Sequence, residues 1–474
     1  MEPSNESFHH TAAETMRIPA IRIGIPIGFC AIGLATLWLP GATPLLTCAG
    51  WLLAYLIVAI PYSRTGFATR TGSWTLWAAS LAMTAGIIVN CHYYICVWGH
   101  GLPDSPVLMN LDAWSAWNNA LADLGRDDAM RCHWPAVGYG HLTGVLLGII
   151  GTDICVPLMF NMLCALATIA LTGYTAAACC PTAPKRYADT AMLLACACCY
   201  FIASAAVLIK DCPLAASVAL CAYAAVSARR RPSAINVLAL IAATVITAYC
   251  RPNYLLVLAA VIVAMNGWSQ RHSRIYGCGA LAVIMIVWIG FQYSGTVASI
   301  SNFIDLSGRS LGDESGRGIQ HSLYFRLFND YYSFSTVSKL LLLPVTTAIQ
   351  FLIPFPWTYD KYLLFGPFMA LAHFSFGRYA VGGLVFYFLA RLFKHRAPQL
   401  LLRLTATGIF FYCASALQFG GTVSRYGIPL VALLVPCAAY SLQTFRKERA
   451  FRIWAAVFSL GMAATLIICY HLTT

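Results

Sequence analysis

Long apolar runs alternate with short polar segments along almost all of this 474-residue chain. Each run approaches the roughly 20 apolar residues that a helix needs to cross a membrane. The runs are continuous, whereas the strands of a membrane β-barrel alternate apolar and polar residues. The pattern therefore predicts an all-α fold, a polytopic membrane helical bundle of about 11–13 transmembrane helices. The predicted spans are 24–41, 43–61, 74–97, 153–178, 187–207, 212–228, 234–250, 253–268, 275–294, 379–393, 403–419, 428–444 and 452–470.

Two long polar regions interrupt this series of spans and divide the chain into four parts. Residues 1–73 form an N-terminal tail and a transmembrane hairpin, and residues 74–294 form a transmembrane core that includes a polar loop at 98–141. Residues 295–378 combine a second polar loop with an interfacial segment rich in proline and aromatic residues, and residues 379–474 are the C-terminal transmembrane helices. The polar N-terminal segment lacks the pattern of a cleavable signal peptide, because its first apolar run leads directly into further spans.

Basic residues concentrate in every second loop, which predicts the orientation of the bundle. Cytoplasmic loops of membrane proteins are enriched in Lys and Arg, so the basic side, which includes the N-terminus, is expected to be cytoplasmic. The two long polar loops, 98–141 and 295–337, then face outward and carry the surface helices of the fold. The residues of the basic side are Arg17, Arg22, Arg64, Arg70, Lys185, Arg186, Arg229, Arg230, Arg231, Arg271, Arg274, Arg391, Lys394, Arg396, Arg403, Arg446, Lys447, Arg449 and Arg452.

Composition agrees with a membrane protein and excludes several function classes. The chain is 59% hydrophobic and 10% charged, with a mean hydropathy of +0.71, whereas soluble domains carry about 25% charged residues. The basic loops account for the formal net charge of +13, so no nucleic-acid partner is expected. Most of the 19 cysteines lie in apolar runs, and no Cys or His cluster has metal-ligand spacing. Whether Cys132 and Cys212, both predicted near the outer side, form a disulfide stays open.

The first outer loop contains a predicted surface helix that begins with an acidic residue. Apolar residues recur at helical spacing over 112–124, and Gly125 is expected to end the helix. Such an amphipathic helix is expected to lie on the membrane surface. Asp112 stands at its start, where a carboxylate caps free backbone amides and interacts favourably with the helix dipole. Asp112 is therefore either a helix cap or a candidate catalytic base.

The order of these features resembles membrane glycosyltransferases of the GT-C class, such as the protein O-mannosyltransferases and the bacterial enzymes that add aminoarabinose to lipid A. In that class, the first large outer loop has an acidic residue at the start of a surface helix, then a Pro/Gly/aromatic stretch and a short apolar helix. Here LDAWSAW (111–117) is followed by HWPAVGYGHLTGVLLGIIG (133–151) and by a long span that begins near Asp153. The acidic loop follows the third span instead of the first, so the first two spans look like an added hairpin.

Three later segments agree with this resemblance. VLIKDCPLAASVAL (207–220) has a Lys-Asp pair at an outer turn, and CRPNYLLVLAAVIVA (250–264) has an arginine at the next outer turn. SRYGIPLVALLVP (424–436) resembles the Arg-Tyr-x-x-Pro start of a late span. Together with the first loop, these segments extend the resemblance over most of residues 105–440.

The resemblance implies an enzyme that moves a sugar from a polyprenyl-phosphate-linked donor to a lipid, glycan or protein acceptor at the outer face of a bacterial inner (plasma) membrane. The acceptor hydroxyl needs a positioned base; Asp112 is the expected catalytic residue, with Asp127 and Asp128 as alternates. Cations near the bilayer surface would stabilise the departing lipid phosphate. No cofactor is indicated, and a single acid in place of an acidic pair leaves the use of a divalent metal open. The expected phosphate-binding residues are Lys210, Arg251, Arg326 and Arg425.

The second outer loop and the segment after it contain candidate contacts to the sugar or the acceptor. Gly, Ser and charged residues over 295–337 predict a loop that could close over a substrate, with Asp313 and His321 as candidate contacts. In LIPFPWTYDKY (352–362), prolines break a continuous helix and aromatic residues favour the membrane interface. Trp357 and Tyr359 are candidates for stacking on a sugar ring.

Other classes of membrane protein fit parts of the pattern. A polysaccharide polymerase of the O-antigen or exopolysaccharide type would also have large outer loops with arginines, and a flippase for lipid-linked oligosaccharides would share the same lipid carriers. Ion-coupled transporters carry ionisable residues near the midplane, whereas the predicted spans here are nearly free of charge in their centres. The exceptions are Asp153 and Arg378, and both are expected near the outer ends of spans. A membrane O-acyltransferase would need a catalytic histidine, for which His373 is a candidate without supporting neighbours. The acidic surface helix favours transfer of a single sugar.

Overall fold

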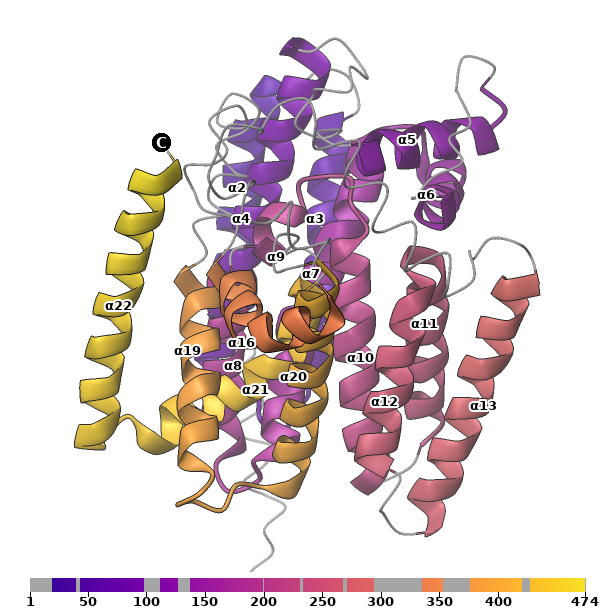
Figure 1. Cartoon of the computed structure of the whole chain (residues 1–474). Coiled ribbons are helices and arrows are strands. Elements are labelled where there is room, and N and C mark those ends of the chain that lie inside the picture. The colour runs from indigo at the N-terminus through magenta and orange to yellow at the C-terminus, as the bar shows by residue number, and fades with distance from the viewer. Residues whose placement is uncertain are drawn as a thin grey trace, which may run out of the picture.

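A computed structural model of the chain describes residues 19–39, 43–97, 111–126, 137–198, 200–230, 233–266, 271–293, 335–352, 376–419 and 427–473. All regular secondary structure in these ranges is helical. Figure 1 shows most of the helices running side by side along one axis. The predicted fold class, an all-α helical bundle, is confirmed for this part of the chain.

The helices follow the predicted spans closely. They are α2 (Pro19–Ala35), η1 (Thr36–Trp38), α3 (Thr43–Ser63), α4 (Arg70–His92), η2 (Tyr93–Val97), α5 (Leu111–Asp123), α6 (Val137–Ile150), α7 (Cys155–Cys179), α8 (Pro184–Ala197), α9 (Tyr200–Ser204), α10 (Asp211–Arg230), α11 (Ala234–Cys250), η4 (Pro252–Tyr254), α12 (Leu255–Asn266), α13 (Arg271–Tyr293), α16 (Thr336–Leu352), α19 (Phe376–Arg391), α20 (Gln399–Phe419), α21 (Ile428–Phe445) and α22 (Arg449–Thr473).

Six helical stretches of the described residues are long and apolar enough to cross a membrane, as expected of a multi-pass membrane protein. They are Thr43–Ser63, Arg70–Cys96, Cys155–Cys179, Asp211–Arg229, Gln399–Leu417 and Ile428–Phe445. Shorter apolar helices, including α11 and α12, accompany them. One predicted span is wrong as a single helix: residues 187–207 contain α8, a break after Ala197 and the short α9.

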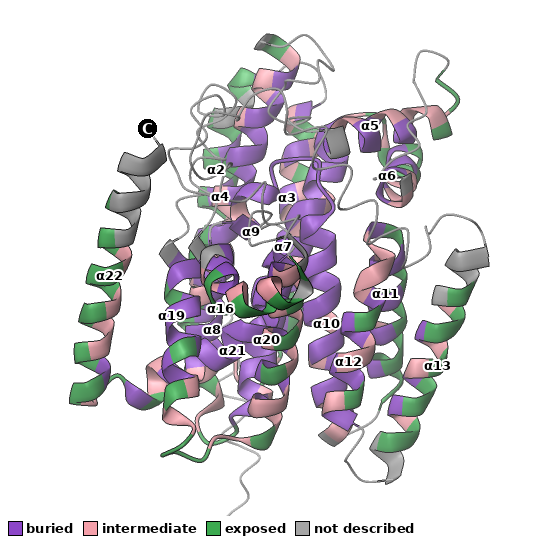
Figure 2. Cartoon of the chain, viewed as in Figure 1, coloured by how far each residue is buried: buried purple, intermediate pink, exposed green. Residues whose placement is uncertain are grey.

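Three helices form the centre of the bundle. About four fifths of the apolar stretches of α7, α10 and α21 are buried, against 33% for α3 and α20 at the periphery. Alanine is frequent in α10, and small residues let helix backbones approach closely inside a membrane. Figure 2 shows this buried centre surrounded by helices with many exposed residues, and large apolar side chains are among them. Exposed residues such as Leu53, Leu238 and Leu460 are therefore expected to contact lipid.

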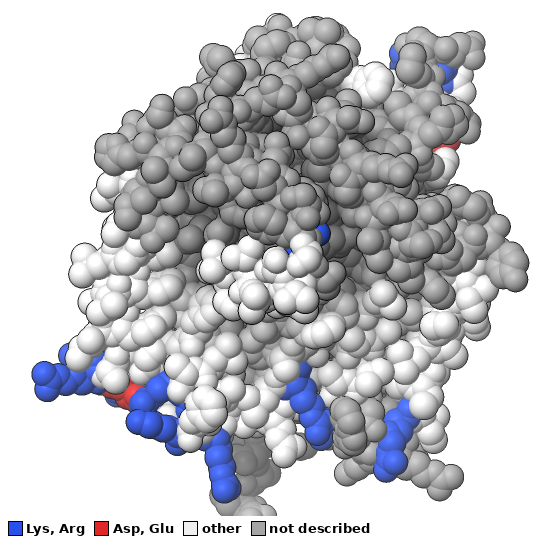
Figure 3. Space-filling model, in the orientation of Figure 1, with Lys and Arg blue, Asp and Glu red and all other residues white. Residues whose placement is uncertain are grey.

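The basic loops lie together at one end of the bundle, here called the basic end. Figure 3 shows Lys and Arg side chains along the lower edge of the molecule, where α19, α20, α22 and α13 begin or end. Contacts between the ends of different helices support this grouping: Gln443 Nε2 of α21 donates to Thr190 Oγ1 of α8 at 2.6 Å, and Thr69 at the start of α4 is hydrogen-bonded to Asp189 of α8. Arg391 also pairs with Glu448. The charge pattern of the sequence thus corresponds to a real segregation in space.

The helices α5 and α6 form a hairpin at the opposite end. In Figure 1, α5 lies across the bundle axis, in the manner expected of a surface helix. Gly125 follows α5 with a φ of +75°, a left-handed conformation that glycine adopts readily, so it ends the helix as predicted. On α6, three glycines four residues apart face α5, and this spacing lets two helices pack closely. They are Gly140 against Ala116 and Asn119, Gly144 against Ala120, and Gly148 against Leu124.

Candidate functional site

The break between α8 and α10 is the most irregular backbone of the described core. After α9 (Tyr200–Ser204), residues 205–210 form turns instead of helix, and α10 begins at Asp211. We call residues 200–210 the interrupted segment. All its side chains except that of Ile202 are buried. Backbone N–H and C=O groups inside a membrane protein must find partners within the protein, and non-helical backbone occurs there only where such partners exist.

Two buried asparagines supply these partners. Asn90 of α4 donates from Nδ2 to the carbonyl of Ala206 at 2.6 Å. Asn161 of α7 donates from Nδ2 to the carbonyls of Val207 at 2.9 Å and Ile209 at 3.1 Å. Neither asparagine was identified from the sequence, although an amide inside an otherwise apolar span is itself a signal of a buried polar network.

The hairpin is connected to the same network through α6. The hydroxyl of Tyr139 donates to Asn161 Oδ1 at 2.9 Å, so it fixes the orientation of the amide that holds the interrupted segment. The neighbouring Gly138 packs against the C-terminal end of α11, where a Cβ atom would lie 2.3 Å from the carbonyl oxygen of Tyr249. The start of α6 is therefore linked through Asn161 to the interrupted segment, and it contacts the last turn of α11, which Arg251 follows.

Lys210 and Asp211 lie at the junction of the interrupted segment and α10. Their residues are only 5% and 1% exposed. Tyr200 donates from its hydroxyl to Asp211 Oδ2 at 2.8 Å. Long basic side chains near helix ends often extend to the membrane surface, whereas the structure places Lys210 inside the protein. Ionisable residues buried in a membrane bundle are rare and usually serve function.

Arg251 belongs to the same region. It follows α11 directly, is half-buried, and its guanidinium lies 5.8 Å from the centre of the Tyr254 ring. The thiol of Cys250 is within electrostatic reach of Lys210, Asp211 and Arg251. Thr247 near the end of α11 donates to Ser217 near the start of α10 at 2.8 Å. Two of the four cations predicted to bind phosphate, Lys210 and Arg251, therefore lie at the same end of two packed helices, as does the buried carboxylate of Asp211. Cys212, a candidate for a disulfide with Cys132, is a free thiol that contacts the hydroxyl of Ser204 at 3.0 Å.

The remaining predicted site residues cannot be placed by the structure. Asp112 lies in the first turn of α5, as predicted, but its side chain is outside the described part. The other candidates all lie outside the described residues: Asp127, Asp128, Asp313, His321, Arg326, Trp357, Tyr359 and Arg425, together with Cys132 and His373.

Three further ionisable contacts at this end were not assigned from the sequence. Asp123, the last residue of α5, pairs with Nδ1 of His141 on α6 and ties the hairpin together. Arg378 is 2% exposed and donates from Nε to the carbonyl of Phe351 at 3.0 Å. Asp153 accepts hydrogen bonds from the hydroxyl of Thr43 at 2.6 Å and from the N–H of Cys155 at 2.9 Å. Asp153 and Arg378 both lie opposite the basic end, where they were expected.

Arg378 also lies next to the interrupted segment. The preceding Gly377 packs against the end of α8, where a Cβ atom would be 2.1 Å from the carbonyl oxygen of Ala197. Buried cations therefore lie at both ends of the region between α8 and α10. Arg378 is near the end of α8, and Lys210 is the last residue before α10.

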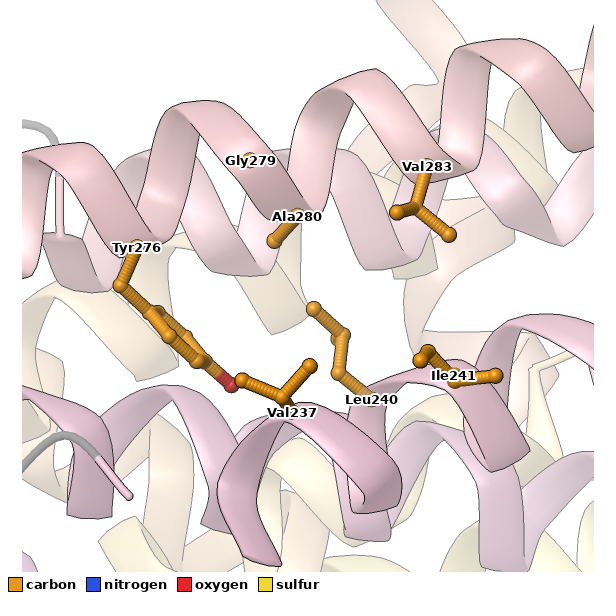
Figure 4. A pocket seen from close by; sticks show the side chains of 7 residues that line it. All are labelled: Val237, Leu240, Ile241, Tyr276, Gly279, Ala280 and Val283. Atoms are coloured by element: carbon orange, nitrogen blue, oxygen red, sulfur yellow. The ribbon is translucent and has the colours of Figure 1, made fainter. Parts of the chain in front are cut away.

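An apolar cavity lies elsewhere, between α11 and α13. Its volume is about 270 Å³, and Figure 4 shows the side chains that line it. Tyr276 has the one polar side chain among them, and its hydroxyl donates to the carbonyl of Asn236 at 2.9 Å. None of the residues that line the cavity is charged. The lining residues are Val237, Leu240, Ile241, Tyr276, Gly279, Ala280 and Val283.

Comparison of the chain with family models, curated proteins and solved structures found no match. Among the described residues, no group of three His, Cys, Asp or Glu side chains is arranged to hold a metal ion.

Proposed function

We propose that this chain is a membrane glycosyltransferase of the GT-C class, which moves a sugar from a polyprenyl-phosphate-linked donor to a lipid, glycan or protein acceptor with inversion at the anomeric carbon. The reaction takes place at the end of the bundle opposite the basic loops, which is the outer face of a bacterial inner membrane if the basic end is cytoplasmic. The observation that carries the proposal is the buried pair of Lys210 and Asp211 at this end, with the half-buried Arg251 at the end of the adjacent helix α11.

The charges of this group suit a donor whose leaving group is a lipid phosphate. When the bond between the anomeric carbon and the phosphate oxygen breaks, negative charge stays on the lipid phosphate, and nearby cations stabilise it. Lys210 and Arg251 have this role in the proposal, together with Arg326 and Arg425. In a site with little water, such charge interactions are stronger than they are at a surface.

The hairpin supplies the second part of the reaction. The acceptor hydroxyl must lose its proton as its oxygen attacks the anomeric carbon, and Asp112 at the start of α5 is the proposed base. Asp127 and Asp128 are alternates. The hydrogen bond between Tyr139 and Asn161 supports this assignment, because it links the hairpin that carries the proposed base to the segment that carries the proposed phosphate ligand.

A flippase or transporter of lipid-linked saccharides is the second candidate, and the interrupted segment favours it. Transporters bind substrates at discontinuous helices whose unwound backbone lines the binding site. The same cations would then hold the lipid phosphate during translocation without chemistry. A polysaccharide polymerase would use lipid diphosphate donors and build long products.

A transfer assay separates these candidates. Wild-type protein and Asp112→Asn in nanodiscs receive radiolabelled sugar on a panel of synthetic polyprenyl phosphates, with a membrane glycolipid extract as acceptor. We expect label in the acceptor with wild type and a loss of at least about 100-fold with Asp112→Asn, since a general base contributes roughly 10²–10⁴ in rate. Equal rates for the two proteins would remove Asp112 from the mechanism. No transfer by folded wild type from any donor would overturn the proposal and favour the flippase or the polymerase.

A further inference from the structure

Asp211 has one carboxylate oxygen without a hydrogen-bond partner. Oδ2 accepts from the hydroxyl of Tyr200 at 2.8 Å, whereas Oδ1 is buried and has no partner among the described residues. A carboxylate oxygen buried without a donor is costly, and most buried polar atoms in native proteins are paired. Asp211 Oδ1 therefore needs a hydrogen-bond donor that none of the described residues provides.

Capping of α10 does not account for this oxygen. An aspartate at a helix start usually accepts from the N–H of a residue two or three positions on. Two positions after Asp211 stands Pro213, which has no N–H, and the N–H of Leu214 is bound to the carbonyl of Lys210 at 3.1 Å. Oδ1 is thus free of the local contacts that a capping aspartate makes.

Asp153 shows what a capping carboxylate looks like in the same protein. Its Oδ1 accepts from the N–H of Cys155, two residues on, and its Oδ2 from the hydroxyl of Thr43. Both oxygens are used, and both partners are protein groups. Asp153 lies two residues before α7, whereas Asp211 is the first residue of α10, and Asp211 has one oxygen left over and Lys210 directly before it in the chain.

We propose that Asp211 Oδ1 accepts a hydrogen bond from the headgroup of the substrate, namely from a hydroxyl or ammonium group of the sugar whose phosphate is bound by Lys210 and Arg251. The inference rests on the proposed function and deepens it. Cations beside a carboxylate match a headgroup that joins an anion to a hydrogen-bond donor, such as a phosphosugar. Asp211 thereby distinguishes a sugar-bearing lipid phosphate from the bare lipid phosphate that remains after transfer.

Equilibrium binding to the protein in nanodiscs tests this inference. The probes are polyprenyl phosphate, a polyprenyl-phospho-hexose and a polyprenyl-phospho-aminosugar, measured with wild type, Asp211→Asn and Tyr200→Phe. Asparagine keeps the oxygen that accepts from Tyr200 and replaces Oδ1 with an NH₂ donor, which cannot accept. We expect Asp211→Asn to weaken binding of a sugar-bearing lipid about tenfold or more, as for a hydrogen bond to a charged group. Its affinity for bare polyprenyl phosphate should not fall, because a negative charge next to the phosphate has been removed.

Tyr200→Phe is the matched control, since it removes the partner of Oδ2 and leaves Oδ1 unchanged. It should keep the preference of wild type for the sugar-bearing lipid, and both variants should remain monodisperse. A larger effect of Asp211→Asn on the aminosugar lipid than on the hexose lipid identifies the group bound as an ammonium, and the reverse order identifies a hydroxyl. If wild type prefers sugar-bearing lipids and Asp211→Asn preserves that preference, the inference is wrong while the proposed function stands. If folded wild type binds none of the three lipids, both are wrong.

Discussion

Tyr139 donates a hydrogen bond to Asn161 Oδ1 over 2.9 Å, and this contact joins the α5–α6 hairpin to the segment that ends in Lys210. The amide of Asn161 in turn holds the carbonyls of Val207 and Ile209. A displacement of α6 would therefore change the backbone directly before Lys210. The arrangement gives a physical route by which the proposed base and the proposed phosphate ligand keep a fixed relation to each other.

Tyr139→Phe should lower both stability and donor affinity. The substitution leaves Asn161 Oδ1 buried without a donor, which costs about 1–3 kcal/mol in the free energy of unfolding. It also frees the amide to rotate away from Ile209, so the KM for the lipid donor should rise more than kcat falls. Unfolding in detergent and steady-state transfer kinetics measure the two effects.

Tyr276→Phe is the control for this change, because Tyr276 makes one hydrogen bond of the same length, to Asn236 near the basic end. Tyr276→Phe should lower the free energy of unfolding by at most as much as Tyr139→Phe does, with no change in the KM for the donor. Equal changes in KM for both variants would contradict a specific link between the hairpin and Lys210.

Asn161→Ala should be more destabilising than Tyr139→Phe. It removes the donor to the Ile209 carbonyl, one of the two donors to the Val207 carbonyl and the acceptor of the Tyr139 hydroxyl. We therefore expect a loss of about 2–5 kcal/mol in the free energy of unfolding. Asn118→Ala provides the comparison, since the Asn118 amide donates to the carbonyl of Trp114 in its own helix. This variant should lose less than about 1 kcal/mol in the free energy of unfolding. The account of the interrupted segment fails if the two variants are equally stable.

Gly138→Ala tests how tightly α6 is held against α11. The added methyl group would lie 2.3 Å from the carbonyl oxygen of Tyr249, and backbone atoms cannot move aside as a flexible side chain can. We expect a loss of about 1–3 kcal/mol in the free energy of unfolding and reduced transfer activity. Gly279→Ala, at an exposed helical glycine with no atom of the described residues within 4 Å of the new Cβ, should be neutral or stabilising by up to about 1 kcal/mol. A neutral Gly138→Ala would mean that α6 packs more loosely than the structure indicates.

The sequence predicted the helices well because their signal is local. Continuous apolar runs, the amphipathic pattern over 112–124 and the helix-ending Gly125 all act within a few residues. The structure confirms the helix and its end at Gly125, and it has helices at the predicted spans, with 187–207 divided in two. The segregation of the basic loops to one end also followed from the sequence alone. Consecutive spans run in opposite directions, so every second loop lies at the same end.

The interruption before Lys210 could not be predicted in the same way. Residues 200–209 read as a continuation of an apolar span, with no proline or glycine to end it. The turns are stabilised by Asn90 and Asn161, which lie 116 and 46 residues away from the carbonyls of Ala206 and Val207. Tertiary hydrogen bonds of this kind override local helix preference. The burial of Lys210 and the pairing of Asp123 with His141 were missed for the same reason. Each depends on packing between separate helices, which the local sequence does not show.

Cysteine labelling can establish which face each end of the bundle occupies. The background lacks Cys30, Cys96 and Cys278, the exposed cysteines of the described residues, and also Cys132, Cys199 and Cys469. In it, Thr152→Cys and Lys394→Cys place exposed thiols at opposite ends. We expect a membrane-impermeant maleimide to label Thr152→Cys in intact cells and Lys394→Cys only after permeabilisation, because basic loops face the cytoplasm. The reverse pattern would invert the proposed orientation and place the hairpin on the cytoplasmic side.

The central claim is that the buried cations bind the phosphate of a lipid-linked donor, and the most direct measurement is the donor KM of Lys210→Met compared with Lys394→Met. Methionine retains much of the volume and flexibility of lysine without its charge. Lys394 is an exposed cation of the basic end. We predict that Lys210→Met raises the KM for the polyprenyl-phosphate-linked donor by about tenfold or more, the loss expected for a charge-assisted hydrogen bond, while Lys394→Met matches wild type. The same KM for both variants and wild type would contradict the claim.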